Sequence, residues 1–185
     1  MMRWVKNDSK DPLSDDHRLM DHLSGLLGKV LSNHDVDGLP DMVLHELGHD
    51  NCFSLKKATY LIDNPDFDHL LGVAGYNCNE CSNHKDDLWE NPHTFKDDMK
   101  PAKYHNDIKK ILQSSLKRKD INLNDSGDII QLAKELGVEK PAYFSWNMKY
   151  GNHGLLIFEE PQESVSKWRE GLLTNISALL SFCGI

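Results

Sequence analysis

The sequence predicts an α+β fold that is predominantly helical, with one small antiparallel hairpin near the C-terminal third of the chain. Three observations lead to this prediction. Apolar residues recur at helical spacing in several segments, prolines and glycines stand where those segments begin or end, and two short apolar runs flank a Gly-containing turn. The length of 185 residues and the hydrophobic content of 39% fit a single domain over 1–185.

Two helices are predicted in the first third of the chain. Ser14 can cap a helix that runs to about Asn33, and its apolar residues share one face: Leu19, Leu23, Leu26, Leu27 and Val30. Pro40 then suits the first turn of a second helix, because proline lacks only an N–H that would be unpaired there. We expect this helix to continue to about Asp63, since Pro65 disfavours helical backbone in the residue before it.

The middle of the chain is less regular. Residues 65–75 are predicted to form a short helix or turn with a glycine exit, and residues 76–100 show little periodicity. Trp89 and Phe95 indicate that this irregular segment is held against the core. A segment of this length without regular structure is often functional, so residues 76–100 are a candidate metal-binding region.

The last part of the chain returns to regular patterns. Pro101 opens a helix, and a shorter helix over 126–136 ends at Gly137. Residues 142–148 and 154–160 predict the two strands of the hairpin. An apolar stripe over 163–182 predicts a final helix.

Charge and composition narrow the function classes. The formal net charge is -8, so the chain repels phosphate backbones and nucleic acid is not an expected partner. No apolar run approaches the roughly 20 residues that span a bilayer, and the N-terminus has no secretory pattern, so we expect no membrane partner and a cytoplasmic location. In that location the four cysteines are expected to be thiols or metal ligands. They are Cys52, Cys78, Cys81 and Cys183.

Residues 45–49 read HELGH and supply the first candidate site. Residues four apart lie on one face of a helix, so His45 and His49 can reach the same metal ion. Cys52 falls on that face one turn further on. Zinc accepts nitrogen and sulfur ligands, and all three side chains are therefore admissible. Gly48 inside this helix costs about 1 kcal/mol against alanine, which predicts the close approach of another segment.

This stretch resembles the HExxH helix of the zincin metallopeptidases. The resemblance implies that His45 and His49 bind zinc and that Glu46 is the general base for a metal-bound water. It covers five residues and the apolar run before them. Cys52 and Leu55 stand where one branch of these enzymes has a glycine and a third histidine. Another branch takes a downstream glutamate, for which Glu80 and Glu90 are the nearest candidates.

The second candidate site is CNECSNH, which places Cys78, Cys81 and His84 within seven residues. A CxxC pair is a common half of a zinc site, but the chain has no second CxxC. Cys52, His69, His93 or the HELGH helix are the candidates to complete it. One hypothesis joins both segments, with His45, His49 and one of these cysteines around one metal.

The sequence therefore predicts a cytoplasmic metalloprotein that binds zinc or another divalent transition metal. If it is an enzyme, the predicted reaction is hydrolysis of a peptide or small molecule by metal-activated water, with Glu46 as base. The alternative is a non-enzymatic regulatory or interaction module whose metal is enclosed by CxxC and HxxxH ligands. A third interpretation is an interaction scaffold that binds no metal. A homo-oligomer is compatible with all three interpretations.

Overall fold

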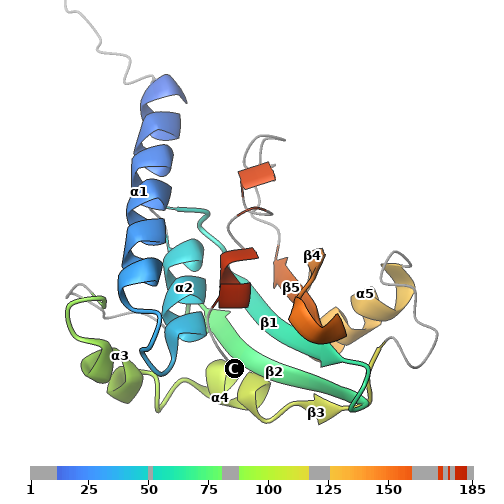
Figure 1. Ribbon diagram of the computed structural model, residues 1–185. Helices are drawn as coiled ribbons and strands as arrows, with labels where there is room; N and C mark the ends of the chain where they lie inside the picture. The colour runs from blue at the N-terminus through green and yellow to red at the C-terminus, as the bar shows by residue number, and fades with distance from the viewer. Residues whose placement is uncertain are drawn as a thin grey trace, which may run out of the picture.

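The computed structural model describes residues 12–49, 52–80, 88–116, 126–159, 171–172, 175 and 178–182. Its centre is a five-stranded antiparallel sheet in the order β3-β2-β1-β5-β4 (Figure 1). The strands are β1 (Lys57–Asn64), β2 (His69–Asn77), β3 (Leu112–Gln113), β4 (Pro141–Asn147) and β5 (His153–Glu159). Strands β1 and β2 pair as an antiparallel hairpin. The other side of β1 pairs with β5, and β5 in turn pairs with β4.

The predicted helical predominance is wrong, because the sheet is much larger than one hairpin. Two of its strands replace predicted helix: the HELGH helix ends at Gly48 rather than near Asp63, and residues 69–77 form β2. Residues 58–63 are buried throughout β1, which places this strand in the centre of the fold. A strand buried on both faces lacks the alternating pattern by which an exposed strand is recognised.

Helices cover both faces of the sheet. The first face packs against α2 (Leu39–Gly48) and the short 3-10 helix η3 (Ala178–Phe182), and α1 (Pro12–Ser32) packs on the other side of α2. The second face packs against α4 (Lys103–Lys109) and α5 (Ser126–Glu135). Each face has its own hydrophobic core, called here the first core and the second core after the face that it covers. Successive strand residues point to opposite faces, so Tyr60 of β1 lies in the first core and Leu61 lies in the second core.

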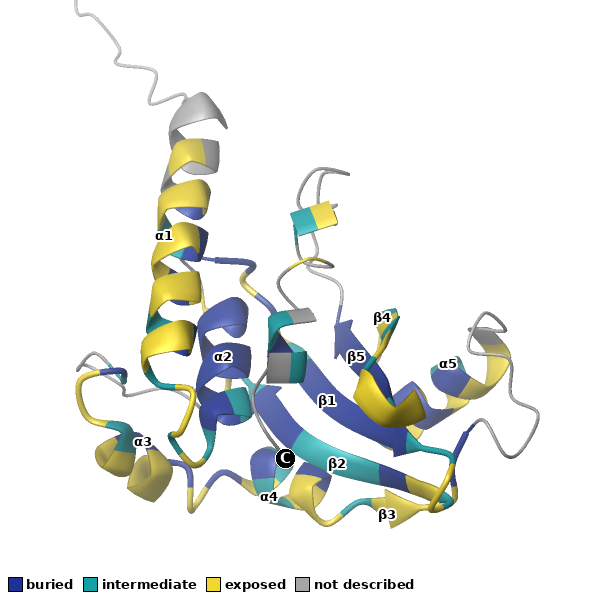
Figure 2. Ribbon diagram, in the orientation of Figure 1, coloured by how far each residue is buried: buried dark blue, intermediate teal, exposed yellow. Residues whose placement is uncertain are grey.

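Burial follows this layered arrangement (Figure 2). Helix α2 lies between α1 and the sheet and is buried almost throughout, whereas the outer side of α1 is exposed. Helix α3 (Pro92–Asp98) inserts Phe95 into the first core, and Trp89 before it is also buried. Both aromatic residues pack against the core as expected, but the prediction that residues 76–100 are irregular is wrong at residues 92–98, which form α3, and at residues 76–77, which end β2.

Two glycines in β2 allow α4 to lie directly on the strand. A Cβ atom at Gly72 would stand 1.8 Å from the carbonyl oxygen of Ile108, and one at Gly75 would stand 2.7 Å from Cγ1 of the same residue. Both distances are far below van der Waals contact. These glycines therefore mark a close approach of helix to strand, not the exit of a helix.

Other predicted elements are confirmed. Helix α1, helix α5 and the β4–β5 hairpin occur where the periodicity predicted them, and the helix after Pro101 begins at Lys103. The predicted final helix lies largely outside the described residues, and its described end is η3. Among the described residues, no helix has the length and apolar character to cross a membrane.

Candidate functional site

The two histidines of the HELGH stretch, His45 and His49, do not lie on one helix face. Helix α2 ends at Gly48, and His49 is its C-cap with extended backbone at φ −64° and ψ 153°. The four-residue spacing brings two side chains together only where both residues are helical. His49 is exposed, whereas His45 is buried. Helical spacing therefore does not apply to this histidine pair.

Glu46 faces α1 and the irregular segment. The indole Nε1–H of Trp89 donates a hydrogen bond to Oε1 of Glu46 at 2.7 Å. Nε2 of His22 lies 2.9 Å from Oε2, and Nζ of Lys29 lies 3.7 Å from Oε1. The carboxylate therefore connects α2 to two residues of α1 and to Trp89, in a position that is largely shielded from water.

His45 faces the sheet and α3, away from Glu46. Its ring makes edge-to-face contacts with Tyr76 of β2 and Phe95 of α3, at centroid distances of 5.5 and 5.4 Å. The side chain is 5% exposed. Such contacts contribute about 0.5–1.5 kcal/mol beyond apolar burial. The imidazole thus occupies an aromatic part of the first core.

The ring of Tyr76 explains why position 48 is a glycine. A Cβ atom at Gly48 would lie 2.3 Å from Cε1 of Tyr76, and the Tyr76 hydroxyl donates to the Gly48 carbonyl oxygen at 3.1 Å. The expected close approach of another segment at Gly48 is confirmed. The end of α2 is therefore held against the C-terminal part of β2.

The cysteines of the two motifs lie in different surroundings. Cys52 is buried in the first core, and its N–H donates to the carbonyl oxygen of His49 at 2.9 Å. Cys78 is an exposed thiol immediately after β2, and its N–H donates to the Lys56 carbonyl oxygen at 2.9 Å. The predicted ligands Cys81 and His84 lie outside the described residues.

A tight turn follows β2 at Cys78. The N–H of Glu80 donates to the carbonyl oxygen of Asn77 at 2.9 Å, and the N–H of Asn79 donates to the Asn77 side chain at 3.2 Å. The Glu80 carboxylate accepts the backbone N–H of Tyr104 at 2.9 Å, at the first turn of α4. This side chain is therefore occupied in capping α4.

A cavity of about 400 Å³ opens beside this turn. It lies at the end of the sheet where β1 begins and β5 ends, and it is lined by Lys56, Lys57, Asn77, Cys78, Asn79, Glu139 and Glu159. Nζ of Lys57 donates to the Gly137 carbonyl oxygen at 2.6 Å, and Nζ of Lys56 lies 3.7 Å from Glu159. No sequence pattern indicated this polar cavity, because its residues come from four separate segments.

Within the described ranges, no three His, Cys, Asp or Glu side chains are grouped closely enough to hold a metal ion. Comparison with models of protein families, with curated proteins and with solved structures finds no match. The residues themselves are therefore the basis for a functional proposal.

A further polar cluster joins α2 to α4 around the buried Asp41 and His105, and no sequence pattern indicated it. Nζ of Lys109 lies 2.6 Å from Oδ2 of Asp41, and Nδ1 of His105 lies 3.4 Å from Oδ1. Burial raises the pKa of the Asp41 carboxyl despite the two neighbouring bases, and burial lowers the pKa of the His105 imidazole. Asp41 and His105 are 64 positions apart in the sequence, so no local sequence signal indicates this contact.

Proposed function

We propose that this protein binds a divalent transition metal, zinc in the first instance, at a non-catalytic site built on Cys78 and Cys81. In this proposal the HELGH helix has a structural role, and the metal has a structural or regulatory one. The observation that carries the proposal is the turn over residues 77–80, which reverses the chain at an exposed thiol. A CxxC pair binds one metal when the chain turns between its two cysteines.

His84 and His49 are the ligands that we propose to complete the site. His49 is exposed at the end of α2, and the Tyr76–Gly48 hydrogen bond joins that end to the strand that leads into Cys78. His69 is not suitable, because it begins β2 while Cys78 follows its end, and a nine-residue strand spans about 27 Å. Four protein ligands leave no open position for a substrate, which is typical of structural zinc sites.

The contacts of Glu46 favour this non-enzymatic reading over hydrolysis. A general base must direct a lone pair at the water that it deprotonates. The Glu46 carboxylate instead accepts the Trp89 N–H and faces two basic side chains, His22 and Lys29. Hydrolysis by metal-activated water stays a prediction that a direct assay can decide.

The test is the metal content of protein purified without chelator. We expect about one zinc ion per chain in the wild type and in Glu46→Gln. We expect loss of the metal in the double variant Cys78→Ser/Cys81→Ser and weaker binding in His49→Ala. Cys78 and His49 are exposed, so substitution at either of these two positions avoids the buried core. Circular dichroism of each variant checks that it is folded.

Two results would contradict the proposal. One is wild-type protein without metal whose melting temperature does not rise when zinc is added, because a ligand that binds only the folded state must stabilise it. The other is zinc-dependent cleavage of peptides or esters that Glu46→Gln abolishes while metal content is kept. That second result would establish the hydrolase prediction instead.

A further inference from the structure

In the part of the chain that the structure describes, strand β4 is an open edge of the sheet. It pairs with β5 on one side only, and it is longer than the other edge strand, the two-residue β3. Its sequence, PAYFSWN, contains no charged residue. Edge strands are usually protected from further pairing by charges, bulges or prolines, and β4 has only Pro141 at its first position.

The hydrogen bonds at the hairpin turn identify which backbone groups face outward. The N–H of Met148 donates to the carbonyl oxygen of Asn152 at 2.8 Å. Because bonding direction alternates along an antiparallel strand, Phe144 and Trp146 direct their backbone groups toward β5. Tyr143, Ser145 and Asn147 direct theirs away from the sheet. Among the described residues, nothing pairs with these outward groups.

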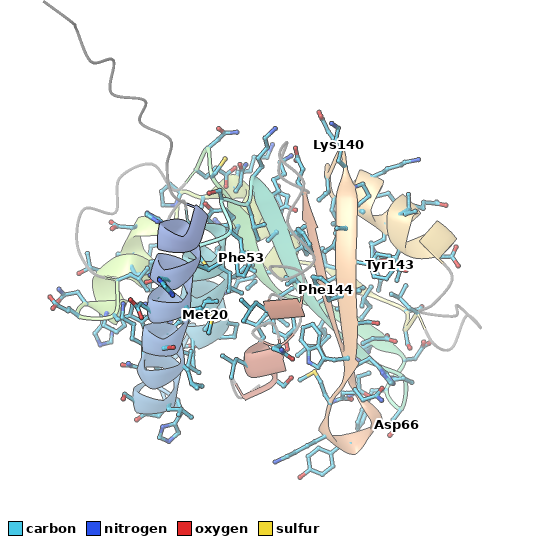
Figure 3. The ribbon with its side chains drawn as sticks, turned by 90° about the horizontal axis from the view of Figure 1, so that it is seen from above. Met20, Phe53, Asp66, Lys140, Tyr143 and Phe144 are labelled. Carbon is cyan, nitrogen blue, oxygen red and sulfur yellow. The ribbon has the colours of Figure 1, made fainter. Side chains whose placement is uncertain are left out.

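The side chains of β4 are already used within the chain, which leaves its backbone edge for a partner. Figure 3 shows Tyr143 and Phe144 pointing to opposite sides of the strand, Tyr143 toward α5 and Phe144 toward η3. Trp146 stacks on Tyr60 and donates its indole N–H to the Ser181 hydroxyl. The edge is thus rigidly placed, so a pairing strand would not have to order it first.

We propose that two copies of this chain form a dimer by antiparallel pairing of their β4 strands, with the two-fold axis at Phe144. This register sets Tyr143 opposite Ser145 of the second copy, and Pro141 opposite Asn147. Outward-facing groups then meet outward-facing groups, as a hydrogen-bonded ladder requires. The two sheets become one continuous sheet of ten strands.

Charge complementarity selects this register. Glu139 lies two residues before β4 and Lys149 lies two residues after it, so antiparallel pairing about Phe144 brings the strand end next to Glu139 close to the strand end next to Lys149 of the other copy. Both residues are exposed, and neither has an ion-pair partner in the part of the chain that the structure describes. A shift of the axis by one residue to Ser145 would displace the two strands by two residues, about 7 Å, and would move these charged ends apart.

The test is sedimentation velocity of the full chain over a concentration series. Ser145→Pro removes one outward N–H and keeps every bond between β4 and β5. We expect it to raise the dimer dissociation constant at least about tenfold, because two symmetric hydrogen bonds are lost and the rings obstruct the partner strand. Ser145→Ala is the matched control, and we expect a change below about twofold.

Charge reversal tests the same interface at exposed positions that do not threaten folding. Glu139→Lys and Lys149→Glu should each weaken the dimer by about three- to tenfold, and the double reversal should restore it. A wild-type chain that stays monomeric across the series overturns the proposal. A dimer that Ser145→Pro and both single reversals leave unchanged also overturns it, because another surface then holds the two copies.

Discussion

The carboxylate of Glu46 contacts side chains from two other segments, so we expect its removal to lower stability. In Glu46→Gln the amide can still accept the Trp89 N–H, but the contacts of the carboxylate with His22 and Lys29 are lost. The free energy of unfolding should fall by about 1–3 kcal/mol, measured by urea denaturation. Glu90→Gln, at an exposed neighbour of Trp89, is the control that should change it little. Equal stabilities of these two variants would contradict a structural role for Glu46.

Gly48 and Gly28 are both helical, and the structure predicts opposite effects when each becomes alanine. At Gly28 nothing lies within 4 Å of a Cβ atom, so Gly28→Ala should stabilise the protein by up to about 1 kcal/mol through helix propensity. At Gly48 the ring of Tyr76 occupies that space, so Gly48→Ala should destabilise by about 1–3 kcal/mol. Thermal unfolding of both variants measures the difference. A stabilising Gly48→Ala would show that Tyr76 does not pack there.

The candidate site shows what sequence could and could not predict at the scale of residues. Local sequence patterns were enough to predict the helix that carries HELGH and the close approach of another segment at Gly48. The direction of each side chain depends on where the helix stops, and the extended C-cap at His49 separates it from His45. The partners of Glu46 come from 17 to 43 residues away along the sequence, and no local spacing encodes them.

Between elements, the cluster of Asp41 on α2 with His105 and Lys109 on α4 predicts a pH dependence. The pKa of His105 is lower in the folded protein than its ordinary 6.5, so the unfolded chain binds the proton more readily. This contribution to stability is full above about pH 6.5 and is lost as the pH falls toward the folded pKa. The raised pKa of Asp41 acts oppositely: its contribution grows as the pH falls through that value toward 3.8.

We therefore expect His105→Gln to reduce the loss of melting temperature between about pH 7.5 and pH 5.5, compared with the wild type. The comparison uses the pH slope, because removal of a buried side chain lowers stability at every pH. His69→Gln, at an exposed histidine, is the control and should keep the wild-type slope. An unchanged slope in His105→Gln would assign the dependence to other groups.

Most elements that were predicted correctly differ in their surroundings from those that were missed; β5, which is buried in all seven residues, was recognised through its pairing with β4 across the Gly-containing turn. Helices α1 and α5 and strand β4 each have one covered side and one exposed or partly exposed side, so their apolar residues recur with the period of the element. Strands β1 and β2 lie between two helical layers, and glycines in β2 serve the approach of α4. Their sequences therefore carry little period, and only the assembled sheet determines them.

At the scale of the whole molecule, the two cores share one sheet. The first core packs α1, α2 and η3 on one face, and the second packs α5 on the other. Adjacent residues of β1 contribute to both, with Tyr60 in the first core and Leu61 in the second. Loss of either helical layer exposes one face of the same strands. We therefore expect the two cores to unfold together in one cooperative transition.

Paired truncations test this coupling. Leu44 in α2 and Ile129 in α5 are both fully buried, on opposite faces of the sheet. Leu44→Ala and Ile129→Ala should each lower the free energy of unfolding by about 2–5 kcal/mol, because each leaves a cavity. The double variant should show the sum within about 0.5 kcal/mol, since the side chains share no neighbour, and a single transition in both circular dichroism and fluorescence. Two separate transitions, each shifted by only one of the substitutions, would show that each face of the sheet has its own independent core.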